Sequence, residues 1–260
     1  MRSSTRDRLI VGLDLPDSKT AQDMVARLGD SVGFYKIGME LIYGGGLDLV
    51  KWLAGNGKRV FVDLKLHDIP NTVEKAAAQI ARLGADFLTI HAYPQTMRAA
   101  QAGVAGSGLK LLAVTIMTSF DEADVRAAGY SHGMADMVTL RARQARESGI
   151  AGLILPACEV QAMRALLGPE TILVSPGIRP AGSQIGDQKR VMTPALAIAA
   201  GADYLVVARP ILAALDPKAA AEAIIADIAV GEAMRNITNG NAARTCDPLA
   251  GTQAGSVSRT

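Results

Sequence analysis

The chain has 260 residues, 49% of them hydrophobic, and a formal net charge of +2. This length and apolar content suit a domain with a sizeable core, and the scattered Lys and Arg residues form no basic face of the kind that nucleic-acid-binding proteins carry. Because no apolar run reaches the roughly 18 residues of a membrane-spanning helix and no signal peptide is recognisable, we expect a cytoplasmic protein without nucleic-acid or membrane partners.

Short apolar runs, each about the length of a β-strand, recur between residues 9 and 208. There are eight of them: residues 9–15, 33–38, 59–65, 86–92, 109–117, 151–156, 171–177 and 203–208. Such runs, nearly continuous in apolar residues, are typical of parallel strands that are covered on both faces. The sequence therefore predicts eight parallel strands.

The segments between these runs carry the signals of helix starts and ends. Residues 18–29 form an amphipathic segment that ends at a glycine, and Asn71 with Glu74 resembles a capping box. Pro194 stands where a first helical residue is expected. Strand and helix thus alternate along the chain.

Eight alternating units in about 230 residues favour an α/β fold of one domain, a closed (β/α)8 or TIM barrel. We place the barrel at residues 9–230, after a short N-terminal segment of residues 1–8. Residues 231–260 are poor in large apolar side chains and rich in Gly, Asn, Thr and Ser. Such a composition cannot offset the entropy lost on ordering, so we expect a flexible C-terminal tail.

Charged residues stand at the ends of the first three predicted strands. Asp14 ends the first strand, Lys36 ends the second, and Asp63 and Lys65 end the third, with Asp68 in the loop beyond. Because side chains alternate along a strand, Asp63 and Lys65 are expected on the same face. The carboxyl ends of barrel strands form the rim that carries active sites, so these charges are predicted to converge there.

Arginines and glycines stand in the last two loops of the predicted barrel. Arg179 follows the seventh strand and Arg209 the eighth, where barrels commonly bind a phosphate group. Glycines at positions 177, 182 and 186 would let the first of these loops close over a ligand. Together the two loops predict a phosphate-binding site.

Several motifs together resemble the orotidine 5′-phosphate decarboxylase family, over about residues 9–228. They are DLKLHDIPNT at 63–72, LD at 13, YKIGMEL at 35, TS at 118, PGIR at 176, DQ at 187 and RPI at 209. The resemblance implies decarboxylation of orotidine 5′-phosphate to uridine 5′-phosphate in de novo pyrimidine synthesis, without a metal or organic cofactor. It also implies a homodimer whose two sites lie at the interface.

The same resemblance implies the catalytic residues. Lys36, Asp63 and Lys65 of one subunit and Asp68 of the other would form an alternating network of charges around the carboxylate that is lost. Lys65 corresponds to the proton donor of the family.

The resemblance further implies the residues that hold the rest of the nucleotide. They are Asp14 and Lys36 at the ribose hydroxyls, Thr72 of the partner at the same ribose, Ile69 of the partner at the base, Thr118 or Ser119 at the pyrimidine, Gln188 between base and phosphate, and Arg179 and Arg209 at the phosphate. One position departs from the family, because Ala208 stands where a glycine usually precedes this last arginine. Alanine keeps the backbone N–H and is tolerated if its φ is negative.

Three other functions remain open from the sequence. A Mg²⁺-dependent sugar-phosphate decarboxylase or synthase of the same barrel group shares the Asp-x-Lys-x-x-Asp pattern but not the IPNT that follows here. A Schiff-base aldolase would need Lys36 or Lys65 with a lowered pKa, whereas neighbouring acids raise it. A nucleotide-phosphate-binding protein without turnover would be expected to lack Lys65 or Asp68, and both are present.

Overall fold

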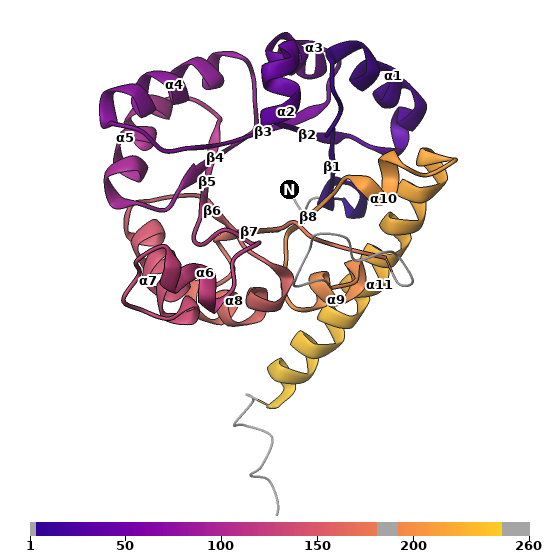
Figure 1. The fold of residues 1–260 in the computed structure, drawn as a ribbon. Coiled ribbons are helices and arrows are strands. Elements are labelled where there is room, and N and C mark those ends of the chain that lie inside the picture. The colour runs from indigo at the N-terminus through magenta and orange to yellow at the C-terminus, as the bar shows by residue number, and fades with distance from the viewer. Residues whose placement is uncertain (1–3, 181–191, 246–260) are drawn as a thin grey trace, which may run out of the picture.

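The computed structural model describes residues 4–180 and 192–245, and within them eight parallel strands close into a barrel (Figure 1). The strands are β1 Leu9–Gly12, β2 Phe34–Gly38, β3 Arg59–Leu66, β4 Phe87–His91, β5 Lys110–Val114, β6 Gly152–Ile154, β7 Ile172–Ser175 and β8 Tyr204–Val207. They follow one another in chain order around the barrel, and β1 pairs with β8 to close it. The eight predicted strands and the (β/α)8 fold are therefore confirmed.

Helices surround the barrel and connect its strands (Figure 1). They are α1 Ser18–Leu28, α2 Met39–Leu41, α3 Leu47–Gly55, α4 Pro70–Arg82, α5 Pro94–Val104, α6 Glu122–Ala127, α7 Met134–Glu147, α8 Val160–Leu167, α9 Pro194–Ala199, α10 Arg209–Leu212 and α11 Pro217–Thr245. Shorter turns are the 3₁₀ helices η1 Thr5–Arg8, η2 Gly29–Ser31 and η4 Ala157–Glu159 and the π-helix η3 Ile42–Gly46. None of the helices in the described part combines the length and apolar composition that a bilayer crossing needs.

Two of the three helix signals read from the sequence are confirmed, and one is wrong. Helix α1 ends at Gly29 with φ of 55°, and Pro194 begins α9 after Thr193 as its N-cap. Helix α4 instead begins at Pro70, so Asn71 already lies inside its first turn and forms no capping box. Proline fixes φ near the helical value and has no N–H to leave unsatisfied, which lets the helix start before the predicted cap.

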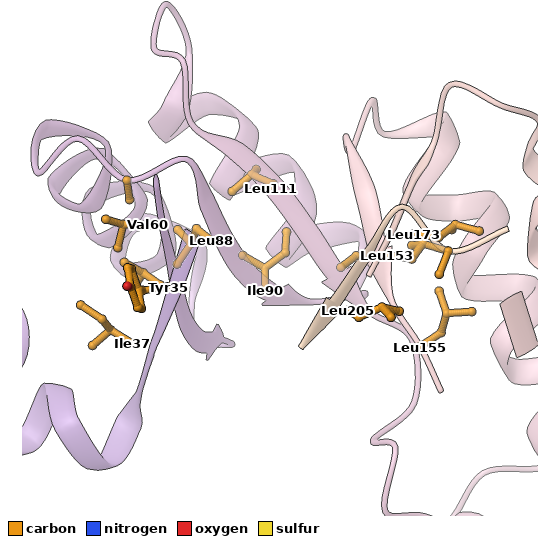
Figure 2. Packing of buried hydrophobic residues seen from close by; sticks show 14 of the residues in the cluster. Tyr35, Ile37, Val60, Leu88, Ile90, Leu111, Leu153, Leu155, Leu173 and Leu205 are labelled. Atoms are coloured by element: carbon orange, nitrogen blue, oxygen red, sulfur yellow. The ribbon is translucent and has the colours of Figure 1, made fainter. Parts of the chain in front are cut away.

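The alternation of side chains along the strands creates two cores. One fills the barrel interior with Ile10, Phe34, Phe61, Phe87, Leu112, Val114, Ile154, Val174 and Val206. The other lies between the strands and the surrounding helices; Figure 2 labels Tyr35, Leu88 and Ile90 among its members.

Arg59 stands at the start of β3, where the interior core begins, and its guanidinium lies 4.1 Å from the ring centroid of Phe34. The interior is thus packed from the amino ends of the strands upward, and space for a ligand is left at the carboxyl ends.

Helix α11 continues past residue 230, where the sequence placed the end of the barrel domain. Glu232 pairs with Arg8, and Arg235 donates a hydrogen bond to the carbonyl oxygen of Ala202. Gly231 is buried, and a Cβ built on it would lie 2.4 Å from the carbonyl oxygen of Ala195. This part of the predicted tail packs through small and charged residues, which a count of large apolar residues overlooks; residues 246–260 lie outside the described ones.

We predict that Gly231→Ala lowers the free energy of unfolding by about 2 kcal/mol, because the new methyl group must push α11 away from α9. Chemical denaturation of the full chain measures the change. Gly55→Ala is the matched control, since a Cβ there meets no atom within 4 Å at the end of α3. A Gly231→Ala variant as stable as the wild type would mean that the barrel domain does end near residue 230.

Candidate active site

Four of the predicted charged residues meet at the carboxyl ends of β1, β2 and β3. The Nζ atom of Lys36 lies 2.9 Å from Oδ1 of Asp14 and 3.7 Å from Oδ2 of Asp63. The Nζ atom of Lys65 lies 2.8 Å from Oδ1 of Asp63. Asp63 is thus held between two lysines, and positive and negative charges alternate along the row.

Glycines make room for this row of charges. Lys36 is only 9% exposed, and a Cβ on Gly38 would lie 2.9 Å from its Nζ. A Cβ on Gly12 would lie 3.2 Å from the Cε atom of the same lysine. Larger residues at either position would displace the lysine from its two carboxylates, so the glycines of β1 and β2 help to set the geometry of the site.

Lys65 reaches Asp63 by a route that differs from the predicted regular strand. The pairing of β3 with β4 shifts register between Val62 and Leu66, and Lys65 has φ of 50°. It is the one non-glycine residue with a positive φ within the described ranges, a conformation that costs about 1–2 kcal/mol for an L-residue. The expectation of simple alternation through Lys65 was therefore wrong, although the predicted meeting of the two side chains is present.

The surroundings of Asp63 keep its carboxyl ionised. Burial raises its pKa, but the positive charges of Lys36 and Lys65 and hydrogen bonds from Lys65 and Thr89 outweigh that effect. The net result is a pKa below the ordinary value for aspartate. At neutral pH the site therefore contains a fixed anion next to two ammonium groups.

A cavity of about 120 Å³ opens beside these charges. It is lined by Lys36, Phe61, Asp63, Lys65, Val114, Met117, Thr118, Ile154, Pro176 and Val206. Thr118 was predicted from the sequence, but the apolar side chains of the lining were not. Several of them, such as Phe61, also belong to the interior core, so the alternation of side chains along the strands could have indicated them. Typical small-molecule sites measure roughly 300–1,000 Å³, so a nucleotide placed here would extend out over the rim.

The cavity does not include three residues predicted to serve a partner subunit. Asp68 is exposed in the loop after β3, where its Oδ1 accepts a hydrogen bond of 2.6 Å from the backbone N–H of Ile69. Ile69 is 66% exposed, and Thr72 is exposed in the first turn of α4. All three therefore face away from the packed core of their own chain.

The predicted phosphate ligands lie on neighbouring strand ends, after β7 and β8. Arg179 is half-buried and donates from Nη1 to the carbonyl oxygen of Ile178, 2.9 Å away, while Arg209 is exposed as the first residue of α10. Ala208 has φ of −120°, so the negative φ that an alanine needs at this position is present. Gln188, together with the glycines at 182 and 186, lies outside the described residues.

An aromatic and cationic cluster, which sequence reasoning missed, lies behind the loop that carries Asp68. His67 stacks on Tyr93 with ring centroids 4.4 Å apart, and its Nδ1 lies 3.0 Å from Oγ1 of Thr96. The guanidinium of Arg141, which is 5% exposed, lies 4.4 Å from the ring centroid of Tyr93 and donates to the hydroxyl of Tyr130. These contacts join α5 and α7 to the start of the loop.

His91, at the end of β4, lies beside this cluster, 5.6 Å from His67 between ring centroids. Burial lowers the pKa of His91, and the positive charges of His67, Arg141 and Lys65 lower it further. Across the described ranges, no group of three or more His, Cys, Asp and Glu side chains is arranged to hold a metal ion. The two histidines therefore pack as ring partners.

We predict that Arg141→Met lowers the free energy of unfolding by about 2–4 kcal/mol, because the carbonyl of Thr115 loses its buried donor and the Tyr130 hydroxyl keeps Tyr93 but loses the guanidinium. Denaturant titration gives the value. Arg143→Met, on the exposed side of the same helix, is the control and is expected to change it by less than about 0.5 kcal/mol. Equal effects of the two variants would rule out a structural role for the cluster.

Residues 7–224 match the sequence profile of the family described as "Orotidine 5′-phosphate decarboxylase / HUMPS family". An orotidine 5′-phosphate decarboxylase of Bradyrhizobium sp. (strain BTAi1 / ATCC BAA-1182) is 64% identical over 234 residues, which cover 90% of this chain and 96% of the relative. One of Rhodopseudomonas palustris (strain ATCC BAA-98 / CGA009) is 61% identical over 224 residues, 86% of this chain and 94% of the relative.

Among solved structures, the orotidine 5′-phosphate decarboxylase of Lactobacillus acidophilus superposes with a TM-score of 0.76 at 39% identity, covering 85% of this chain and 99% of that one. The family match over residues 7–224 spans all eight strands and the positions of the four meeting charges. The chain therefore belongs to the orotidine 5′-phosphate decarboxylase / HUMPS family.

Proposed function

We propose that this chain decarboxylates orotidine 5′-phosphate to uridine 5′-phosphate, in the de novo biosynthesis of pyrimidines. The observation that carries the proposal is the row Lys36, Asp63 and Lys65 at the mouth of an apolar cavity. The relatives that are 61–64% identical are named for this activity. The proposed reaction needs neither a metal nor an organic cofactor, and we place the enzyme in the cytoplasm.

The chemical demand of the reaction explains why a lysine stands at the cavity. When the bond between C6 of the pyrimidine and the carboxylate breaks, the electron pair stays on C6, in the ring plane, with little resonance relief. An ammonium group close to C6 stabilises this developing charge, and more strongly where water is scarce. We assign this role to Lys65, in support of which it lines the cavity together with apolar side chains.

The same lysine can complete the reaction. A proton passes from Nζ of Lys65 to C6 as carbon dioxide leaves, which gives the product and a neutral amine that regains its proton from solvent. Asp63 lies 2.8 Å from this nitrogen and holds it in place before the reaction. It would also lie beside the carboxylate of the substrate, a like-charge contact that is relieved when carbon dioxide departs.

We propose further that two copies of the chain form a homodimer with shared sites. Asp68 would complete the alternating charges of the partner's site, Ile69 would line its base pocket, and Thr72 would reach its ribose. In support, Asp68 is exposed beside an isoleucine that is 66% exposed, and a large apolar side chain in water suits burial at an interface.

The remaining nucleotide contacts follow from positions around the rim. We assign Asp14 and Lys36 to the ribose hydroxyls, Thr118 to the pyrimidine, Gln188 to base and phosphate, and Arg179, Arg209 and the backbone N–H of Ala208 to the phosphate. In support, Thr118 lines the cavity, and the two arginines follow adjacent strands at the same rim. Charge-assisted bonds from arginine suit a phosphate dianion.

We predict that Lys65→Ala lowers kcat for orotidine 5′-phosphate by at least about 1,000-fold, because both charge stabilisation and the proton donor are lost. The loss of substrate absorbance is followed in buffer containing EDTA. If the reaction depended on Mg²⁺, the wild type would show no turnover in this buffer. Titration with uridine 5′-phosphate is expected to show affinity within about tenfold of the wild type.

Lys110→Ala is the control for this substitution, since Lys110 is exposed at the start of β5. Turnover by Lys65→Ala at the wild-type rate would refute the assignment of the proton donor. Wild-type turnover that requires Mg²⁺ would favour the sugar-phosphate enzymes of the family instead.

A second prediction concerns the shared site. Lys65→Ala and Asp68→Ala chains are each expected to be inactive, but after subunit exchange about a quarter of wild-type activity should return, because half of the dimers are mixed and one of their two sites is intact. Activity after mixing, against each variant alone, is the measurement. Mixing Lys65→Ala with Asp63→Ala is the control: both residues serve the same subunit's site, so no activity should return. Absence of recovery in the first mixture would assign Asp68 to its own subunit.

A further inference from the structure

Thr89 is a buried polar residue in the middle of β4, a strand that is otherwise mostly apolar. It lies two residues after Phe87, on the face that points into the barrel interior, and is 0% exposed. A hydroxyl in such a place destabilises the fold unless its hydrogen bonds are made. The partners of Thr89 therefore indicate what it does.

The partners come from the irregular part of β3. Val62 pairs with Leu88 and Leu66 pairs with Ile90, so the segment 63–65 of β3 faces the single residue Thr89 of β4. In a regular parallel ladder the N–H of a strand residue bonds to a backbone carbonyl. Here the N–H of Lys65 donates instead to the side-chain oxygen of Thr89, at 2.9 Å.

The Thr89 hydroxyl has one hydrogen to donate, and it donates this hydrogen bond to Asp63. Oγ1 of Thr89 donates to Oδ1 of Asp63 at 2.8 Å, and the same carboxylate oxygen accepts from Nζ of Lys65, also at 2.8 Å. The contacts thus close a ring that runs from the backbone N–H of Lys65 through Thr89 and Asp63 back to the side chain of Lys65. Both ends of the lysine are fixed by this ring.

We infer that Thr89 is a positioning residue, which holds the left-handed backbone of Lys65 and orients Asp63 so that the ammonium group points into the cavity. Thr89 itself is not among the residues that line the cavity, so it acts through these two neighbours. The kinetic part of this inference rests on the proposed decarboxylation, whereas the effect on Asp63 does not. No charge is altered by replacing Thr89, because the groups facing Asp63 from β2 and β3, Lys36 and Lys65, are kept.

The test compares Thr89→Val, which keeps the shape but removes the hydroxyl, with Thr89→Ser, which keeps the hydroxyl. Thr89→Val is expected to lower kcat about 10- to 100-fold with KM within about threefold, and Thr89→Ser to stay within about threefold of the wild type in both. If Thr89→Val does not fold, Thr89→Cys replaces it, because a thiol is a weak donor of similar size.

Thr115→Val is the matched control. Thr115 is also 0% exposed, beyond the end of β5, and its Oγ1 has no hydrogen-bond partner in the part of the chain that the structure describes. The same chemical change there is expected to leave kcat at the wild-type value. If Thr115→Val lost as much kcat as Thr89→Val, the loss would reflect the replacement of a buried threonine in general rather than the hydrogen bonds of Thr89, and the inference would be overturned.

A second readout does not depend on turnover. The carboxyl of Asp63, labelled with ¹³C and assigned by its loss in Asp63→Asn, is titrated by NMR; its pKa should rise in Thr89→Val and not in Thr89→Ser, because a bond to the ionised form is lost. The acid limb of kcat should move to higher pH in the same variant. An unchanged titration of Asp63 in Thr89→Val overturns the inference. An inactive wild type with the expected titrations would refute only the proposed reaction.

Discussion

The site depends on one carboxylate, Asp63, that is held between two ammonium groups. Taking Asp63 out of water is unfavourable by itself, and the nearby charges of Lys36 and Lys65 reverse the balance, so that the pKa of the acid falls below its ordinary value. Asp14 pairs with Lys36 in turn, and the four charges sum to zero. A neutral set of this kind can be held at the rim of an apolar barrel, where any one of its members alone would be costly.

The barrel makes this arrangement rigid and keeps it partly dry. Aromatic side chains and Arg59 pack the interior from below, and apolar residues such as Phe61 continue the same faces of the strands up to the charges. Lys36 and Asp63 stand on β2 and β3, which pair along this stretch, and Lys65 is held by its contacts with Thr89 and Asp63. The electrostatic interactions are strong in this setting because little solvent and little motion weaken them.

Much of the fold and part of the site could be predicted from the sequence. The features that could not be predicted share one physical cause. The eight strands and their order follow from local periodicity, and the geometry of barrel rims predicts that Asp63 and Lys65 lie close together. The register shift in β3, the ring through Thr89 and the packing of α11 depend on contacts between segments far apart in the chain. Single-sequence patterns record the period of an element but not the partner it meets, so a buried threonine or a packed glycine carries no local signal.

The cluster around Arg141 packs against the loop that carries Asp68, and this packing bears on the proposed homodimer. A buried guanidinium that pairs with no carboxylate in the described part of the chain is unusual, and here it packs on Tyr93, which stacks on His67 at the start of the loop with Asp68. Ordering a loop lowers its entropy, and this loop directs its acid and its isoleucine away from the cavity of its own chain. An ordered loop whose side chains do not reach the cavity of their own chain is expected if those side chains enter the site of a partner. The packing around Arg141 therefore favours the proposed pairing of the chain with a second copy.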